Sequence, residues 1–187
     1  MSIIIDSNLT EQEVKLQNPL LPCPEEILEN QKVLGVRYWS FDNKLHQGQI
    51  VIDKRLEKDI IQIFEAIEKE EFPITSVVPA SDPKFHWDDA VLMDKNNTSA
   101  FNYRTIAGQE KLSLHAFGQA IDINPRLNPY INKDGIVEPS GATRDLSKPG
   151  TIADDSFLIK LFEELGWEWG GRWKEIKDYQ HFQKPIS

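Results

Sequence analysis

Apolar residues recur at helical spacing in one stretch of the first half of the chain. Within residues 56–67 they fall at offsets 0, 4, 7, 8 and 11, which places them on one face of a helix. Asp53 stands before this stretch as a candidate N-cap, and Phe72-Pro73 ends it, because a residue before proline avoids the helical conformation. The pattern therefore predicts an amphipathic helix with its apolar face in a core.

A second helical stripe covers residues 157–165 in the last third of the chain. We expect Asp154 or Asp155 to cap its beginning and Gly166 to end it, since glycine readily takes the left-handed conformation that closes helices.

Shorter apolar runs and alternations predict strands. They cover residues 33–39, 49–52, 74–78 and 120–124. In the last of these, Ile121 and Ile123 would fill the core, so Asp122 would point to the opposite face.

The remaining stretches are rich in polar residues and proline. Residues 82–109 and 125–150 are predicted to be long loops, a feature often linked to function in small domains. Residues 1–30 lack a sustained apolar period and are predicted to be an arm that packs on the domain formed by residues 31–187. This mixture favours a single α+β domain with a small antiparallel sheet and flanking helices.

Composition narrows the class of protein. The chain has 187 residues, a formal net charge of −9 and a pI near 5.0, so a nucleic-acid partner is not expected. Its single cysteine, Cys23, excludes an intramolecular disulfide framework and a four-cysteine zinc site. No apolar run reaches the roughly 20 residues of a membrane helix. The three isoleucines that follow Met1-Ser2 are too few for the apolar core of a signal peptide, so we expect no export signal in the given sequence. We expect a monomer without a membrane span.

Two segments carry the residue types of a metal site. Residues 113–122 read Ser-Leu-His-Ala-Phe-Gly-Gln-Ala-Ile-Asp, in which the glycine permits a turn that could bring His115 back toward Asp122. Residues 178–182 read Asp-Tyr-Gln-His-Phe, with Asp178 three residues before His181. Each pair alone is more often a structural hydrogen bond. Together, His115, Asp122 and His181 supply the three protein ligands of a catalytic zinc site with its fourth position open to water, and Asp178 is a spare carboxylate that could accept a proton.

The pattern Ser-x-His-x-x-Gly-x-Ala-x-Asp, followed by a distal acidic-x-x-His, resembles the zinc D-alanyl-D-alanine carboxypeptidases. This group includes VanY-like carboxypeptidases, L-alanyl-D-glutamate endopeptidases and the related zinc fold of hedgehog domains. Residues 166–173, Gly-Trp-Glu-Trp-Gly-Gly-Arg-Trp, and residues 96–104, Asn-Asn-Thr-Ser-Ala-Phe-Asn-Tyr-Arg, are similar to the endopeptidase and VanY-like branch. The resemblance extends over about residues 45–184.

The resemblance implies a role for each matching residue. It implies one zinc ion bound by His115, Asp122 and His181, with Asp178 as general base where many relatives have glutamate. Arg104, 11 residues before His115, takes the place of an arginine that binds a substrate carboxylate or polarises the scissile carbonyl.

The resemblance also covers two serines. Ser113 matches a family serine that orients a ligand or contacts substrate, although a role in the turn alone is equally compatible with its position. Ser99 is a further candidate for substrate contact.

Other residues with metal-binding or ligand-binding side chains have simpler interpretations. We expect residues 86–89 to form a cleft wall or plain surface, His46 to make a structural hydrogen bond, and Cys23 to be an inert buried thiol. The tryptophans at 167, 169 and 173 are expected to pack behind the site rather than bind a glycan.

These observations predict a zinc peptidase that hydrolyses peptidoglycan stem peptides, of the D-Ala-D-Ala carboxypeptidase or L-Ala-D-Glu endopeptidase type. The substrate would place the protein in the cell envelope or periplasm if an export signal has been removed. The alternatives are a zinc-containing binding module without catalysis, and the same peptidase with another divalent ion. The acidic residue kept at position 178 favours catalysis over a binding module.

Overall fold

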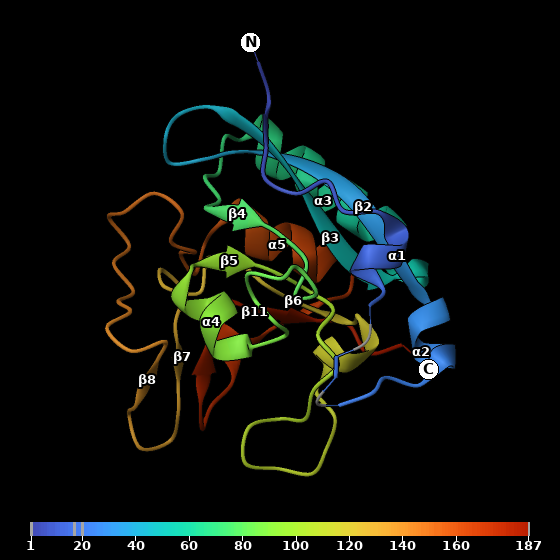
Figure 1. The fold of residues 1–187 in the computed structure, drawn as a ribbon. Helices are drawn as coiled ribbons and strands as arrows, with labels where there is room; N and C mark the ends of the chain where they lie inside the picture. The colour runs from blue at the N-terminus through green and yellow to red at the C-terminus, as the bar shows by residue number, and fades with distance from the viewer. Residues whose placement is uncertain (1, 17, 20, 187) are drawn as a thin grey trace.

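The longest paired element is an antiparallel hairpin. In the computed structural model, which describes residues 2–16, 18–19 and 21–186, the strands β2 (Gln31–Trp39) and β3 (Leu45–Asp53) pair along their whole length. The short strand β1 (Ile4–Ile5) adds to β3 in parallel. Figure 1 shows this hairpin beside α3 (Glu57–Lys69).

Helix α3 follows the hairpin through the 3₁₀ turn η1 (Lys54–Leu56). The Asp53 side chain caps that turn by accepting a hydrogen bond from the Arg55 backbone N–H at 3.0 Å. The face of α3 that packs into the core is fully buried and consists of Ile60, Ile63, Phe64 and Ile67. The predicted helix and its predicted cap residue are thus confirmed, although the cap closes the 3₁₀ turn that precedes the helix.

A second, antiparallel sheet has the order β6–β11–β9, with β6 (Ala120–Asp122), β11 (His181–Gln183) and β9 (Glu168–Trp169). Phe182, in the central strand, lies opposite Ile121 on one side and Trp169 on the other. Helix α5 (Phe157–Glu164) covers this sheet, and the ring of its Phe162 stacks on Phe182 with 3.9 Å between centroids. The apolar faces of both sheets and both helices therefore meet in one core.

The remaining elements are short. They are α1 (Glu11–Val14), α2 (Glu25–Glu29), β4 (Ser76–Val77), α4 (Asp89–Asp94), β5 (Asn97–Thr98), the 3₁₀ turn η2 (Leu114–Phe117), β7 (Tyr130–Ile131), β8 (Val137–Glu138), the 3₁₀ turn η3 (Gly170–Arg172) and β10 (Lys177–Asp178). Strands β4 and β5 pair in parallel, and β10, β7 and β8 form an antiparallel sheet in that order.

Several predicted details are wrong, while the mixed helix-and-strand architecture is confirmed. The strand expected over residues 74–78 is only the two residues of β4, because its partner β5 is equally short. The predicted loop 82–109 contains α4 and β5, and the predicted loop 125–150 contains β7 and β8. Instead of one sheet, the described residues form four small sheets, two of which contain a parallel pair, while the sheet of β6, β11 and β9 is antiparallel as predicted.

The cap of α5 also differs from the prediction. The hydroxyl of Ser156, rather than Asp154 or Asp155, accepts from the Leu158 backbone N–H at 3.1 Å. Serine adjoins the first helical residue and so occupies the capping position itself.

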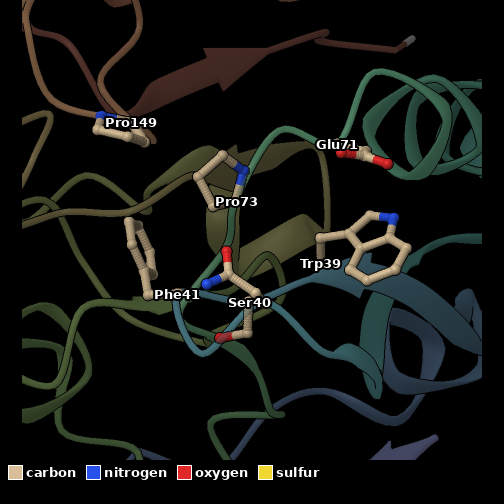
Figure 2. Close-up of a pocket in the computed structure, with 7 residues that line it drawn as sticks. Trp39, Ser40, Phe41, Glu71, Pro73 and Pro149 are labelled. Carbon is tan, nitrogen blue, oxygen red and sulfur yellow. The ribbon is translucent and has the colours of Figure 1, made fainter. Parts of the chain in front are cut away.

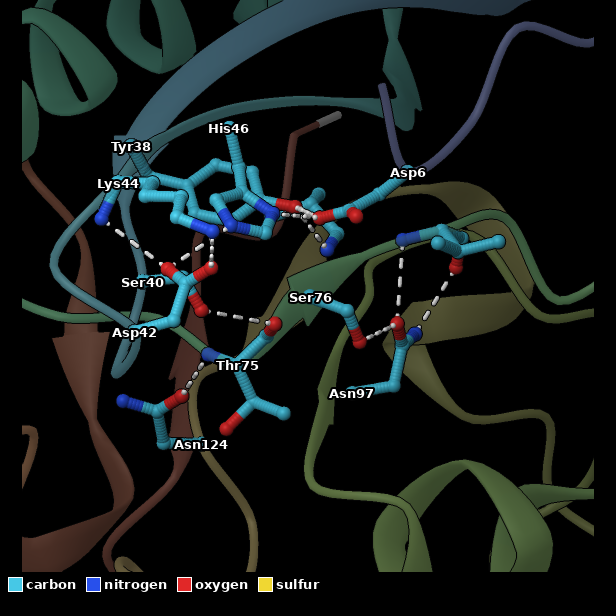
Figure 3. A network of polar contacts seen from close by, with 12 residues as sticks. Asp6, Tyr38, Ser40, Asp42, Lys44, His46, Thr75, Ser76, Asn97 and Asn124 are labelled. Atoms are coloured by element: carbon cyan, nitrogen blue, oxygen red, sulfur yellow. Dashed lines mark hydrogen bonds and ion pairs between the residues drawn. The ribbon is translucent and has the colours of Figure 1, made fainter. Parts of the chain in front are cut away.

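The segment after β1 is anchored to the hairpin by a polar network (Figure 3). Asp6 accepts hydrogen bonds from the hydroxyl of Tyr38 and from Nδ1 of His46, the latter at 2.9 Å. The other ring nitrogen of His46 lies 3.1 Å from Asp42, so both of its nitrogens have carboxylate partners. His46 therefore has the structural role that its sequence context predicted.

Across the part of the chain that the structure describes, every helix is too short or too polar to cross a membrane.

Candidate metal centre

The turn η2 places His115 in the interior of the protein. Ser113 caps this turn, since its hydroxyl accepts from the His115 backbone N–H at 3.3 Å. Gly118 ends it with φ of 65°, a left-handed conformation that glycine adopts without strain, and the chain then enters β6. His115 is buried as a result, with 2% of its surface exposed.

Asp122 and His181 reach the same point from two paired strands. Asp122 is the last residue of β6, His181 is the first residue of β11, and they are direct cross-strand partners. Directly opposed residues point to the same face of a sheet. The sheet register therefore brings together two residues that are 59 positions apart in the chain.

The donor atoms of the three side chains converge. Asp122 Oδ1 lies 2.9 Å from His181 Nδ1, and Asp122 Oδ2 lies 3.2 Å from His115 Nε2. The two ring nitrogens are 3.2 Å apart. One ligand atom from each residue lies within 4.8 Å of the others, so the group could hold a metal ion.

The outward nitrogens of both rings are already occupied. His115 Nδ1 is 2.6 Å from the Ala100 carbonyl oxygen, which can only accept, so this nitrogen carries the proton. His181 Nε2 likewise lies 3.1 Å from Gln183 Oε1. Such partners on the far nitrogen orient the imidazoles of metal sites and leave the inner nitrogens as ligands. The donor set and its surroundings thus fit a divalent cation.

Electrostatics in this cluster favours positive charge between the rings. Burial by itself lowers the pKa of His181, but the hydrogen bond and charge of Asp122 outweigh it and raise that pKa to about 9. For Asp122, burial raises the pKa, and the opposing charge and hydrogen bonds of His115 and His181 bring it well below its usual range. A carboxylate that stays ionised while buried suits a metal ligand.

Asp178 lies at the end of β10, three residues before His181. Its Oδ1 atom is shielded from solvent and has no hydrogen-bond partner among the described residues. Burial of the carboxyl raises its pKa to about 7. The charge of His181 opposes this rise, and the charge of Asp122 adds to it. The backbone at Gly170 passes close to Asp178. Only glycine fits there, because a Cβ at this position would lie 2.7 Å from the Asp178 carbonyl oxygen.

Arg104 lies on the strand-like segment next to the His115 turn. Its carbonyl accepts from the Ser113 backbone N–H at 3.1 Å, which ties Arg104 to the cap of η2. Its Nη2 atom forms an ion pair with Asp89 Oδ2 at 3.0 Å, and its Nε atom is shielded from solvent with no partner among the described residues.

Ser99 acts on the cluster through its backbone. Its N–H donates to the Asp122 carbonyl at 3.1 Å, and its carbonyl accepts from the Asp122 N–H at 2.9 Å. The structure thus gives Ser99 and Ser113 supporting contacts to two residues of the cluster.

Three residues that contact the cluster were not predicted from the sequence. The Ala100 carbonyl is a main-chain acceptor that any residue type could provide. Gln183 follows His181 by two positions in a strand, so its side chain shares that face, and the alternation rule could have found it. Trp173 lies beside the cluster, with its ring centroid 5.5 Å from that of His181.

The other candidates lie away from the cluster or in the core. Cys23 is buried, and burial raises the pKa of its thiol to about 11. Trp167 and Trp169 belong to the core, whereas Trp173 is only half-buried. A cavity of about 300 Å³ opens between Trp39, Phe41 and their neighbours, and none of its lining residues belongs to the cluster (Figure 2).

Two buried imidazoles, one buried carboxylate and a second carboxylate nearby are the side-chain set of a metal-dependent hydrolase. Residues 107–184 match a family model described as D-alanyl-D-alanine carboxypeptidase. This match confirms the family resemblance of the two motifs, and it contains His115, Asp122, Asp178 and His181. Arg104 and Ser99 precede the matched residues. No curated protein and no solved structure gave a significant match.

Proposed function

We propose that this protein is a zinc-dependent peptidase that hydrolyses the stem peptides of peptidoglycan. The observation that carries the proposal is the convergence of His115 Nε2, His181 Nδ1 and the Asp122 carboxylate within a segment that matches a peptidase family. These three residues would hold one zinc ion. When bound, the ion supplies a Lewis acid for the scissile carbonyl and activates water near neutral pH.

Asp178 would act as the general base and acid. Burial raises the pKa of this carboxyl above its usual range and toward the working pH, where a side chain can accept a proton and return it to the leaving amine most effectively. The shielded and unpartnered Oδ1 atom is available for that proton.

Arg104 would bind a carboxylate of the substrate. A guanidinium has five N–H donors, and the described contacts of Arg104 occupy Nη2 with Asp89 and, at 3.4 Å, Nη1 with the Thr105 carbonyl. Donors therefore remain for a charge-assisted hydrogen bond to a peptide carboxylate. Ser113 and Ser99 would line the same site, close to the residues that they support.

The proposal is tested with the stem pentapeptide L-Ala-D-Glu-L-Lys-D-Ala-D-Ala. The purified, zinc-loaded protein is incubated with the peptide, and the products are identified by mass spectrometry. Loss of the terminal alanine indicates a carboxypeptidase, and release of the first alanine indicates an endopeptidase. Elemental analysis of protein purified without added metal identifies the ion.

Two variants complete the experiment. His115→Ala should lose both the metal and the cleavage. His86→Asn is the matched control, because His86 is exposed with φ of 50°, a conformation that asparagine tolerates. Full metal retention in His115→Ala, or an uncleaved peptide with fully loaded wild-type protein, contradicts the proposal. An uncleaved peptide with zinc-loaded wild-type protein would favour a zinc-containing binding module without catalysis.

A further inference from the structure

The Asp89–Arg104 ion pair is a feature that neither motif contains. Asp89 is the first residue of α4, and its Oδ2 atom lies 3.0 Å from Arg104 Nη2. Both side chains are partly shielded, with 25% exposure for Arg104 and 30% for Asp89. A pair in such surroundings is screened less by water and salt than a fully exposed one.

The beginning of α4 is held against the segment that precedes Arg104 by contacts of residues 87 and 88. Asp88 caps the helix by accepting from the Val91 backbone N–H at 3.1 Å. The ring of Trp87 packs edge-on against Phe101, and the Asn102 side chain reaches the Trp87 carbonyl at 3.5 Å. The Asp89 carboxylate is therefore presented by a fixed helix end.

The backbone of the Arg104 segment is fixed from the other side. Asn102 donates its backbone N–H to the His115 carbonyl at 3.0 Å, and the Arg104 carbonyl is bonded to Ser113. These contacts place the start of the Arg104 side chain close to η2. The side chain beyond that point is long and flexible, and its ion pair with Asp89 fixes where the guanidinium ends.

Asp89 also belongs to the electrostatic surroundings of the site. Its charge is one of the causes that raise the pKa of Asp178, after burial and the charge of Asp122. Asp89 therefore pairs directly with Arg104 and also acts electrostatically on Asp178.

We propose that Asp89 is a positioning residue that holds the guanidinium of Arg104 ready for the carboxylate of a peptide substrate. The inference rests on the proposed role of Arg104. A guanidinium that is already held loses less conformational entropy when it binds a ligand, so the ion pair strengthens carboxylate binding without touching the reacting atoms. Asp89 contacts only Nη2, and a quarter of the Arg104 side chain remains exposed, so further N–H donors of the guanidinium remain for the ligand.

The test is a double-mutant cycle of Asp89→Ala, Arg104→Ala and the combined variant. Each protein is assayed with the stem pentapeptide and with the same peptide carrying amidated carboxylates. Asp89→Ala should raise KM for the free peptide about tenfold, change kcat less than about twofold, and leave KM for the amidated peptide and the zinc content unaltered. Arg104→Ala should have an equal or larger effect, and the combined variant should match Arg104→Ala. Asp89→Glu should restore part of the lost affinity.

Matched controls separate positioning from general stability. Asp94→Ala removes another ion pair of the same helix, that with Arg126 at 2.8 Å, and should leave both KM values unchanged. Additive effects of Asp89→Ala and Arg104→Ala, or an equal loss with free and amidated peptides, would overturn the inference.

Failure of the underlying function gives a different result. If Arg104→Ala binds the free peptide as well as wild type does, Arg104 does not bind the substrate carboxylate. The proposed positioning role of Asp89 is then wrong as well. If the peptide is bound but not cleaved, calorimetric titration with the free and the amidated peptide gives Kd values. These replace KM in the same double-mutant cycle. A non-additive cycle there supports the positioning role even though the peptidase proposal has failed.

Discussion

At the scale of single residues, the candidate metal centre consists of two imidazoles that share one carboxylate. His115 and His181 each use the outer ring nitrogen for a structural hydrogen bond, so both inner nitrogens face Asp122. Asp178 has no such partner on Oδ1. The different surroundings of the two carboxylates shift their pKa values in opposite directions, which agrees with the acid–base role proposed for Asp178.

Asp178→Asn should keep zinc and substrate binding but lower kcat by about 10²–10⁴, because asparagine preserves the shape and cannot accept the proton. Zinc content and turnover are measured on the same preparation. Glu175→Gln is the matched control, since Glu175 is an exposed acid three residues earlier, and it should behave as wild type. Loss of zinc from Asp178→Asn would make Asp178 a ligand, and near-normal kcat would give the base role to another group, with Glu175 the first to examine.

Cys23 should react slowly with iodoacetamide in the folded protein. Its thiol is 5% exposed and burial raises its pKa to about 11, so at pH 8 the thiolate fraction is roughly a hundredfold below that of an unperturbed cysteine. Mass spectrometry of the labelled protein follows the rate, and labelling in urea provides the unfolded reference. Equal rates in the two conditions would contradict the assignment of an inert thiol.

At the scale of elements, the turn that carries His115 depends on Gly118. A Cβ at this position would lie 2.6 Å from the Asp53 backbone nitrogen and 2.1 Å from Gln31 Oε1, and the residue has φ of 65°. The hairpin strands and the turn are therefore packed so closely that a side chain cannot fit between them.

Gly118→Ala should lower the free energy of unfolding by about 2 kcal/mol or more, since it adds a clash with backbone to the strain of a positive φ. Gly108→Ala is the control, because Gly108 has φ of 72° but open space around its Cβ position, so it suffers only the strain, about 1 kcal/mol. Urea denaturation measures both values. Equal losses in the two variants would mean that the close packing around Gly118 relaxes without cost.

The elements that could be predicted from the sequence are those with strong local patterns. Helix α3 was predictable because its apolar stripe repeats over a dozen residues, and residues 33–39 lie within the long strand β2. The two-residue strands β4 and β5 were not, because their hydrogen bonds depend on a distant partner. For the site, the two motifs supplied the residues that the structure brings together. The ion pair between Asp89 and Arg104 could not be predicted, because it depends on how α4 packs against the Arg104 segment.

At the scale of the whole molecule, the metal centre joins segments far apart in the chain. η2, β6 and β11 contribute one residue each. Strands β6 and β11 pack into the main core through Ile121 and Phe182, and η2 packs into a second hydrophobic cluster through Ala116. A metal ion bound there would bind the folded state only, so its binding energy would add to the stability of the entire domain.

Removal of zinc with a chelator should therefore lower the melting temperature. At a free zinc concentration of 1,000 times Kd the contribution is about 4 kcal/mol, which corresponds to roughly 8–16 °C for a chain of this size. Differential scanning calorimetry with and without added zinc measures the shift. His115→Ala should melt at one temperature in both conditions, and a zinc-independent melting temperature for wild type would contradict a metal site in the core.

The place of His181 in the middle strand of its sheet has a consequence for biosynthesis. A nascent chain on the ribosome already contains His115 and Asp122 while β11 has yet to be made, so β6 and β9 have no strand to lie between them. Such a chain offers two of the three donors and lacks the residue that pairs with Asp122. If the cluster carries the activity proposed above, hydrolytic activity therefore begins only after translation has passed residue 183. Truncated chains that end before β11 would be inactive.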